Sequence, residues 1–456
     1  MDDKKQKAVV IEISEDEMEY DHKLIIDIKQ KEQTTQVSQQ MKEDDEEISI
    51  DDIKKMIEIS HEEGRSSSLS CIYRVPSTIR LLNHKAYTPK VVSIGPFHHG
   101  NVRLRDMERY KTIMFNTFAR DKDLNSLIEL ARKYEPNVRA SYFDSINYNK
   151  KDLVKLILVD SAFIIELFMM KYKGNINEDP KLSQLWLTEA IRKDLLLLEN
   201  QLPFFFLKKL YNVAFPCNRR GDLPSFLELT YSYFAFFNKQ RLEHNRNIKH
   251  FTDLLRLFYL SRTQPRRDAY QGDDSDQLKY SANELQEAGV KLRKSTSKCL
   301  LDLKFSKSVL EIPQINIDDG TETLFRNIIA LEQCLYYDKS YFTDYIFVWD
   351  TLVNTNKDVE VLSHEDIIDN WLSDGNEAAT LFNGLAKNVS QGKFNSTYAD
   401  ICGRLNKFCQ DPCHKTMASL RRGYCNTRWQ TMASIAAIIL LILTITQTVC
   451  SIFQVV

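Results

Sequence analysis

The sequence predicts a mainly α protein: a large helical globular body with a small β element, followed by one C-terminal transmembrane helix. Helical apolar spacing recurs over most of residues 104–409, whereas the runs that predict strands lie at 299–305 and 309–317. The last 25 residues, 432–456, contain no charged side chain. Because a helix rises about 1.5 Å per residue, about 20 apolar residues cross a bilayer core of roughly 30 Å.

Composition divides the chain into three regions. Residues 1–69 are rich in Asp, Glu, Lys, Gln and Ser, which predicts a disordered acidic N-terminal arm. Residues 70–428 form the expected helical domain, with a polar linker near 262–276, and 429–456 form the expected anchor. A chain of 456 residues is long enough to bury a sizeable core.

The helical domain opens on a segment unlike the rest. Residues 71–100 are dense in Pro, Gly, aromatic and β-branched residues, which predicts an ordered but irregular segment laid over the helices. Apolar spacing then predicts helices at 104–120, 124–134, 152–173, within 182–211, and at 224–237, 248–259, 284–290, 321–337, 342–353, 377–389 and 398–409. Residues 299–305 and 309–317 predict a short pair of strands.

The residues around the expected anchor predict its direction. Lys and Arg residues precede it, nothing after Arg428 is charged, and the N-terminus has no apolar signal region. We therefore expect a single-pass, tail-anchored protein with a cytosolic body at the plasma membrane or an endomembrane, and the lipid bilayer as a partner. Thr444, Thr446, Gln447 and Thr448 are polar within the segment. They predict either a helix–helix contact that forms a homo-oligomer, or Thr bonding within its own helix with Gln447 near the interface.

Charge and cysteine content exclude some functions. The 61 basic and 63 acidic residues give a net charge of −2, so no nucleic-acid partner is expected. The nine cysteines show no disulfide framework, which is typical of a reducing compartment. The cluster Cys402, Cys409, Cys413, His414 and Cys425 fits no common zinc module, and we expect neither a metal nor another cofactor.

Three consecutive polar residues interrupt an apolar run. Glu199, Asn200 and Gln201 lie within LLLLENQLPFFF, and Pro203 should kink the helix and free backbone acceptors. The polar side chains then either build a pocket at the kink or form a structural knot that caps the freed backbone groups. We favour the structural knot.

Two further groups contain residue types that can act in catalysis. Asp160 and Glu166 lie six residues apart, on different helix faces, and Arg192 or Lys193 is a plausible ion partner for one of them. His98 and His99 lack a recognisable nucleophile motif nearby. We expect them to lock a loop in which Gly95, Pro96 and Gly100 set the turn.

Long motifs carry a family resemblance. CIYRVP, AYTPKVVSIGPFHHG, MERYK, LVDSAFIIELF, DLLLLENQLPFFFL, IPQINIDDGTETLFRNIIALEQC and ITQTVCSI resemble, in this order, the plant family called domain of unknown function 247. The resemblance covers roughly residues 71–456. It implies a C-terminal membrane segment and a recognition role, since some grass members are implicated in self-incompatibility. It supplies no catalytic residues. We expect structural roles for its motif residues Pro76, Gly95, Pro96, His98, His99, Gly100, Glu166, Glu199, Asn200, Gln201, Pro203, Asn327, Glu332 and Gln447.

These observations rank three functions. The first is a membrane-anchored interaction or recognition module without catalysis, related to self-recognition or signalling, with an unknown protein partner. The second is an enzyme of unknown class with a polar pocket near His98, His99 and Glu199. The third is a membrane adaptor or scaffold that self-associates through its anchor.

Overall fold

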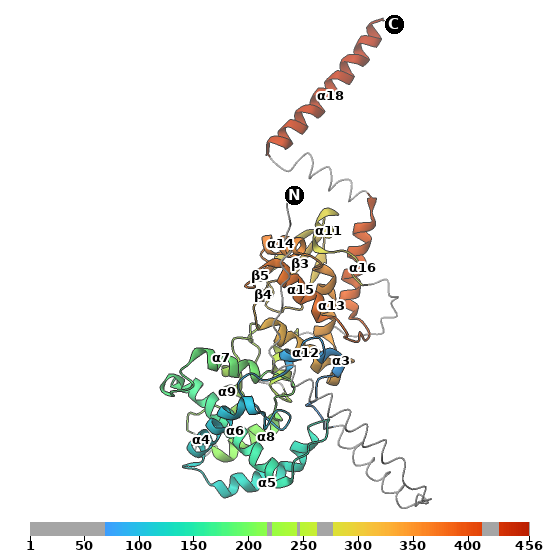
Figure 1. Ribbon diagram of the computed structural model, residues 1–456. Helices are drawn as coiled ribbons and strands as arrows, with labels where there is room; N and C mark the ends of the chain where they lie inside the picture. Colours follow the sequence, from blue (N-terminus) through green and yellow to red (C-terminus); the bar gives the residue numbers. More distant parts are fainter. Residues whose placement is uncertain (1–68, 217–220, 244–246, 262–276, 413–427, 456) are drawn as a thin grey trace, which may run out of the picture. The chain divides into compact units, whose positions relative to one another are not determined.

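The computed structural model describes residues 69–216, 221–243, 247–261, 277–412 and 428–455 (Figure 1). All of these residues belong to one compact unit, Arg65–Val456. The predicted acidic arm, apart from Leu69, and the predicted linker at 262–276 lie outside the described residues.

Helices dominate the described residues, as predicted. The longer ones are α4 (Arg105–Ala119), α5 (Leu124–Ala140), α6 (Lys150–Lys173), α7 (Leu185–Asp194), α8 (Phe204–Ala214), α9 (Phe226–Tyr233), α10 (Phe251–Tyr259), α12 (Thr321–Leu335), α13 (Tyr341–Leu352), α14 (Asn356–His364), α15 (Gly375–Leu385), α16 (Ser396–Gln410) and α18 (Arg428–Val455). The shorter ones are α3 (Ser77–Arg80), α11 (Ala282–Glu287) and the 3-10 turns η2 (His84–Tyr87), η3 (Val102–Leu104) and η4 (Ile176–Glu178). Most predicted helices are confirmed, whereas α14 was not predicted.

Helix α6 is the centre of the N-terminal half. Its apolar residues cover most of its circumference, so that α4, α5, α8 and α9 all pack against it (Figure 1). Phe168 of α6 stacks on Tyr233 with ring centroids 4.3 Å apart and also contacts Phe251. The C-terminal half packs α12, α13 and α15 together, and Trp349 stacks on Phe382 at 4.7 Å.

Two small sheets lie in the C-terminal half. In the first, β3 (Val309–Pro313) pairs in parallel with β1 (Lys291–Ser295) and antiparallel with β2 (Lys304–Ser306). In the second, β4 (Ile315–Ile317) pairs in parallel with β5 (Ile368–Asn370). The predicted strand pair is therefore confirmed in β2 and β3. Strand β1 was missed because its sequence, KLRKS, buries only Leu292 in a row of exposed charges.

Residues 70–104, called the strap from here on, form the irregular segment that the sequence predicts. Apart from α3, η2 and η3, the strap consists of turns, bends and extended backbone. It is nonetheless buried at many positions, including Ile72, Val92 and Ile94, which are 0% exposed. A buried segment without regular pairing needs other partners for its backbone N–H and C=O groups.

The prediction of a kinked helix running through Pro203 is wrong. Helix α7 ends at Asp194, residues 195–203 form turns, and Pro203 precedes the first residue of α8. Four leucines in a row favour a helix locally, but the polar side chains that follow bind the strap and fix a turn instead. Pro203 is well suited to its place, because a helix start needs no N–H from that residue.

The predicted C-terminal transmembrane helix is also wrong. Among the residues that the structure describes, no helix has the length and apolarity needed to cross a membrane. In α18, Ser434 and the four polar residues at 444 and 446–448 limit the unbroken apolar run to 435–443, about 14 Å at about 1.5 Å per residue. The membrane localisation, the tail-anchored class and the direction of insertion that depended on this helix are corrected with it.

The polar side chains of α18 follow one of the two predicted arrangements. The hydroxyls of Thr444, Thr446 and Thr448 donate to the carbonyl oxygens four residues earlier, at 2.7–2.8 Å. This confirms that the threonines bond within their own helix. Gln447 is exposed. The predicted homo-oligomer depended on a membrane-spanning α18 and is not carried forward.

Candidate functional site

Glu199 joins both ends of the strap to the helical body. Its Oε1 accepts a hydrogen bond from the backbone N–H of Val75 at 2.7 Å. Its Oε2 contacts the Arg80 guanidinium and lies 3.2 Å from His98 Nε2. Burial raises the pKa of the carboxyl, but His98 and Arg80 outweigh it and hold the pKa below its usual value. Glu199 is therefore a buried, paired carboxylate.

Asn200 and Asp194 bind the middle of the strap. The Asn200 Oδ1 accepts from the N–H of Ile94 at 2.7 Å, and its Nδ2 donates to the carbonyls of Val92 and Asp194 at 3.0 and 2.9 Å. The Asp194 carboxylate accepts from the N–H groups of residues 90–92 at 2.7–3.0 Å. Ile72 forms a parallel bridge with Tyr142, but residues 90–94 have no strand partner among the described residues. The Asn200 and Asp194 side chains take the place of that partner.

Gln201 holds the turn between α7 and α8. Its Nε2 donates to the carbonyls of Leu195 and Leu197, both at 2.7 Å, and its Oε1 accepts from the N–H of Phe251 at 2.9 Å. The hydroxyl of Tyr142 donates to the Gln201 carbonyl at 2.7 Å. The polar knot expected at residues 199–201 thus exists, built on a turn instead of a kinked helix.

Gly95 lies where the strap comes closest to this turn. Its φ is +74°, and an added Cβ would meet the Gln201 carbonyl oxygen at 2.5 Å and the Tyr142 hydroxyl at 2.8 Å. Its N–H donates to Asp160 Oδ2 at 2.8 Å. Only glycine satisfies both the backbone conformation and the available space.

A second ionic group lies under the strap. Lys111 Nζ, 0% exposed, lies 2.5 Å from Asp160 and 2.7 Å from Glu108, and donates to the Ser93 carbonyl at 2.8 Å. His99 Nδ1 lies 3.3 Å from Glu108. Burial raises the pKa of the Asp160 carboxyl even though Lys111 opposes the rise.

The ion partners predicted for Asp160 and Glu166 are wrong. Asp160 pairs with Lys111, and Arg192 pairs with Glu189 on its own helix. Burial raises the pKa of the Glu166 carboxyl, and the positive charges of Lys122 and Lys173 oppose that rise. The cations that act on Glu166 are therefore Lys122 and Lys173, not Arg192 or Lys193.

Glu108 should make stability depend on acid pH. Burial raises its pKa, but the bonds from His99, Lys111 and Ser93 lower it from 4.5 to about 2. A depressed carboxyl pKa stabilises the fold above pH 4.5, and that stabilisation is lost as the pH falls toward 2. Between pH 6 and pH 3, urea unfolding of the wild type should show a loss about 2 kcal/mol larger than that of Glu108→Gln. Equal losses in both proteins would contradict the assignment.

Asn327 and Glu332 of α12 belong to the predicted set of structural residues and are both buried. Asn327 Nδ2 donates to the Ala86 carbonyl at 2.8 Å, and its Oδ1 accepts from the N–H of Leu198 at 2.9 Å. Glu332, 0% exposed, accepts from Arg256 Nε at 2.7 Å and from the N–H and hydroxyl of Thr343, both at 2.8 Å. Helix α12 is thereby joined to the strap, to α10 and to α13.

The polar side chains that contact the strap are called the strap cluster: Glu108, Lys111, Asp160, Asp194, Glu199 and Asn200, together with Arg80, His98 and His99 of the strap itself. His98 and His99 contact different carboxylates, and those carboxylates also bind backbone groups, Arg80 or Lys111. The two cavities described next are lined by other residues. Among the described residues, no group of three or more His, Cys, Asp or Glu side chains is arranged to hold a metal ion.

A cleft of about 830 Å³, which we call the strand-end cleft, lies elsewhere. It is lined by Ser295, the last residue of β1, by Pro313, the last of β3, and by Trp371, which follows β5. Parallel strands end at the same edge of a sheet, so their carboxyl ends leave room for a ligand there. The aromatic lining consists of Phe236, Phe237, Phe258, Tyr259, Phe325 and Trp371.

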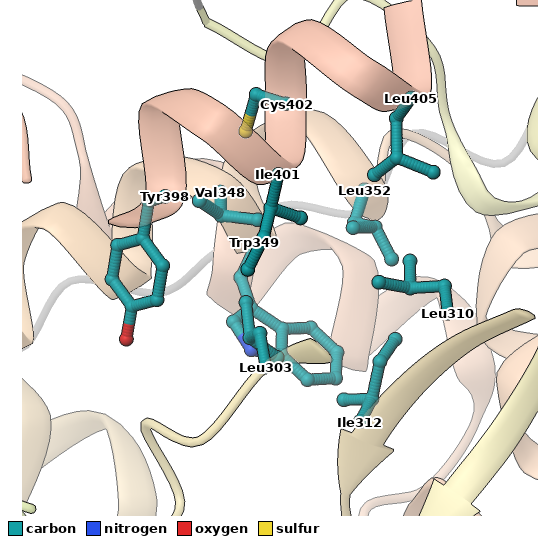
Figure 2. A pocket seen from close by; sticks show the side chains of 10 residues that line it. All are labelled: Leu303, Leu310, Ile312, Val348, Trp349, Leu352, Tyr398, Ile401, Cys402 and Leu405. Atoms are coloured by element: carbon teal, nitrogen blue, oxygen red, sulfur yellow. The ribbon is translucent and has the colours of Figure 1, made fainter. Parts of the chain in front are cut away.

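A second cavity is too small to bind a ligand. Its volume is about 10 Å³, close to the minimum for one water molecule. Figure 2 shows Trp349 of α13 facing Leu303, Leu310 and Ile312, with Ile401 of α16 on the other side. All of its lining is apolar or, at Tyr398, bonded to the Leu301 carbonyl, so we interpret it as a packing gap.

The sequence matches a known protein family. A family model described as a plant protein of unknown function, DUF247, matches residues 72–443. The chain belongs to this family. The match starts within the strap and covers the strap cluster, both sheets and the strand-end cleft.

Two Arabidopsis thaliana relatives of this DUF247 chain are similar over most of their length. UPF0481 protein At3g47200 is 30% identical over 428 residues, covering 86% of this chain and 88% of the relative. Another protein of the UPF0481 series, At3g02645, is 23% identical, covering 82% of this chain and 88% of the relative. No solved structure matches the chain.

Sequence reasoning about this DUF247 chain missed the cleft and several members of the cluster. Lys111, Glu108 and Asp194 lie on amphipathic helices where charges are ordinary, so apolar spacing does not separate them from solvent-facing residues. The signal that could have found them is their place in the motifs MERYK and DLLLLENQLPFFFL. The cleft draws its lining from segments scattered between Phe236 and Trp371. One usable signal was the succession of three short strands over 304–317, since the ends of short parallel strands often border a ligand site.

Proposed function

We propose that this protein is a non-catalytic recognition module that binds a small molecule in the strand-end cleft. The observation that carries the proposal is the contrast between the two sites. The polar residues of the strap cluster are engaged with one another and with backbone groups, whereas the cleft offers about 830 Å³ bordered by exposed Phe236 and Trp371. Ligand pockets typically have about 300–1,000 Å³ and a mainly apolar lining.

In this proposal a buried ion pair between α10 and α12 fixes the two helices that line the cleft. Glu332 of α12 holds α10 through Arg256, and both helices contribute to the cleft floor through Phe325 and Tyr259. A buried salt bridge with satisfied hydrogen bonds fixes such helices in one arrangement. An unknown protein partner and the absence of a nucleic-acid partner stay predictions, and a role in self-recognition or signalling would follow from ligand-dependent recognition.

The binding function can be tested with a neutral fluorescent probe. N-phenyl-1-naphthylamine has an apolar, aromatic body that suits the cleft lining, so we expect saturable, one-to-one binding to the wild type. Thr296 is exposed and lines the cleft, and Thr296→Trp should occupy the mouth and weaken probe binding about tenfold or more. Fluorescence titration measures both affinities.

The matched control adds the same side chain elsewhere. Thr112 is exposed on α4 and does not line the cleft, so Thr112→Trp should bind the probe like the wild type. The proposal is overturned if the wild type shows no saturable binding, or if Thr296→Trp binds as tightly as Thr112→Trp.

A further inference from the structure

The polar side of the strand-end cleft is basic. Lys239, Lys294 and Lys298 line it, and all three are exposed. None of them forms an ion pair with another residue in the described part of the chain, whereas Lys111 under the strap has two. Lysines that converge on a cavity without a carboxylate partner leave an excess of positive charge there.

Only a small opposing charge faces these lysines. Asp318 is the single carboxylate among the described residues of the cleft lining. Its Oδ1 already accepts from the N–H of Gly320 at 2.8 Å and from the Thr321 hydroxyl at 3.0 Å, at the start of α12. Three cations against one engaged carboxylate favour an anionic ligand group.

Hydroxyl groups lie on the same segment as two of the lysines. Ser295 Oγ accepts from the N–H of Ser297 at 3.1 Å, and Ser297 Oγ accepts from the N–H of Cys299 at 3.2 Å. Because each oxygen is used as an acceptor, the O–H of each serine is left to donate. Residues 294–298 therefore present two ammonium groups and hydroxyl donors, a combination that suits a sulfonate, carboxylate or phosphate.

The other side of the cleft is apolar and aromatic. Phe258 and Phe325 are 2% and 3% exposed and form the buried part of the lining. Phe236 and Trp371 are 64% and 73% exposed at the rim. The guanidinium of Arg192 lies 5.2 Å from the centroid of the Phe236 ring. A ligand body of rings or aliphatic chain would cover these faces.

We infer that the strand-end cleft selects a small amphipathic anion, with its charged group at Lys239, Lys294 and Lys298 and its apolar body over the aromatic lining. This inference rests on the proposed binding function and adds the charge of the ligand to it. A volume of about 830 Å³ fits one small molecule of this kind.

Two probes that share one skeleton test the inference. 8-Anilino-1-naphthalenesulfonate carries a sulfonate on the skeleton of neutral N-phenyl-1-naphthylamine, so the difference between their affinities reports the anion. The wild type should bind the sulfonate more tightly. The triple variant Lys239→Gln/Lys294→Gln/Lys298→Gln should lose about tenfold in affinity for the sulfonate and less than about twofold for the neutral probe. Added NaCl should weaken sulfonate binding alone.

A second triple variant separates the site from overall charge. Lys150→Gln/Lys151→Gln/Lys357→Gln removes the same charge from exposed residues outside the cleft and should leave both affinities unchanged. If the neutral probe binds but the cleft lysines affect neither probe, the anion inference is overturned and the binding function stands. If neither probe binds the wild type, both proposals are lost.

Discussion

Replacing Asp160 with alanine is expected to lower the free energy of unfolding by about 3–5 kcal/mol. Asp160 is 1% exposed and pairs with Lys111, which is 0% exposed, at 2.5 Å. The substitution leaves a buried ammonium with Glu108 as its remaining counter-ion, and it removes the acceptor for the N–H of Gly95. Urea unfolding followed by circular dichroism measures the loss.

The Asp160→Ala experiment has two controls: one compares a buried with an exposed ion pair, and the other tests whether Lys111 and Asp160 are energetically coupled. Asp400 pairs with Arg404 at 2.8 Å, but both side chains are about half exposed, so Asp400→Ala should cost less than about 1 kcal/mol. The double variant Lys111→Met/Asp160→Ala should be destabilised by about 1–3 kcal/mol less than the sum of its single variants. Strict additivity would show that the pair is not coupled.

Gly95→Ala is expected to cost about 3 kcal/mol or more, and Gly100→Ala only about 1 kcal/mol. Both glycines have a positive φ, +74° and +89°, so the backbone cost of adding a side chain is shared. They differ in space, because a Cβ at 95 meets the Gln201 carbonyl oxygen at 2.5 Å whereas nothing lies within 4 Å at 100. The difference in urea unfolding free energy between the two variants isolates the close approach of strap and turn. Equal losses would contradict that approach.

Local patterns predicted the helices better than the contacts between them. Apolar spacing placed α4, α6 and α12 within a few residues, because each buries a continuous face. It failed after Asp194, where four leucines favour a helix but hydrogen bonds from Asn200 and Gln201 stabilise a turn. Those bonds join residues that only the tertiary fold brings together.

For the candidate sites, too, the sequence indicated some of the residues involved but not the contacts that they make. Glu199, Asn200 and Gln201 were recognisable because three polar residues in an apolar run need buried partners. The partners of these residues were not recognisable from the sequence, because Val75 and Ile94 lie more than 100 residues away from them. The short strands over 304–317 are the one local signature of the strand-end cleft. Its lysines, hydroxyls and aromatic rings belong to segments that are ordinary when taken one by one.

The strap has a consequence for the order in which the protein folds during synthesis. Ala86 is bonded by Asn327, which lies 241 positions later in the chain. At about 5–20 residues per second, the ribosome needs about 12–48 s to supply that partner after the strap has been made. During this interval the carbonyl of Ala86 is without its final partner, so the strap completes its packing only after α12 has been made.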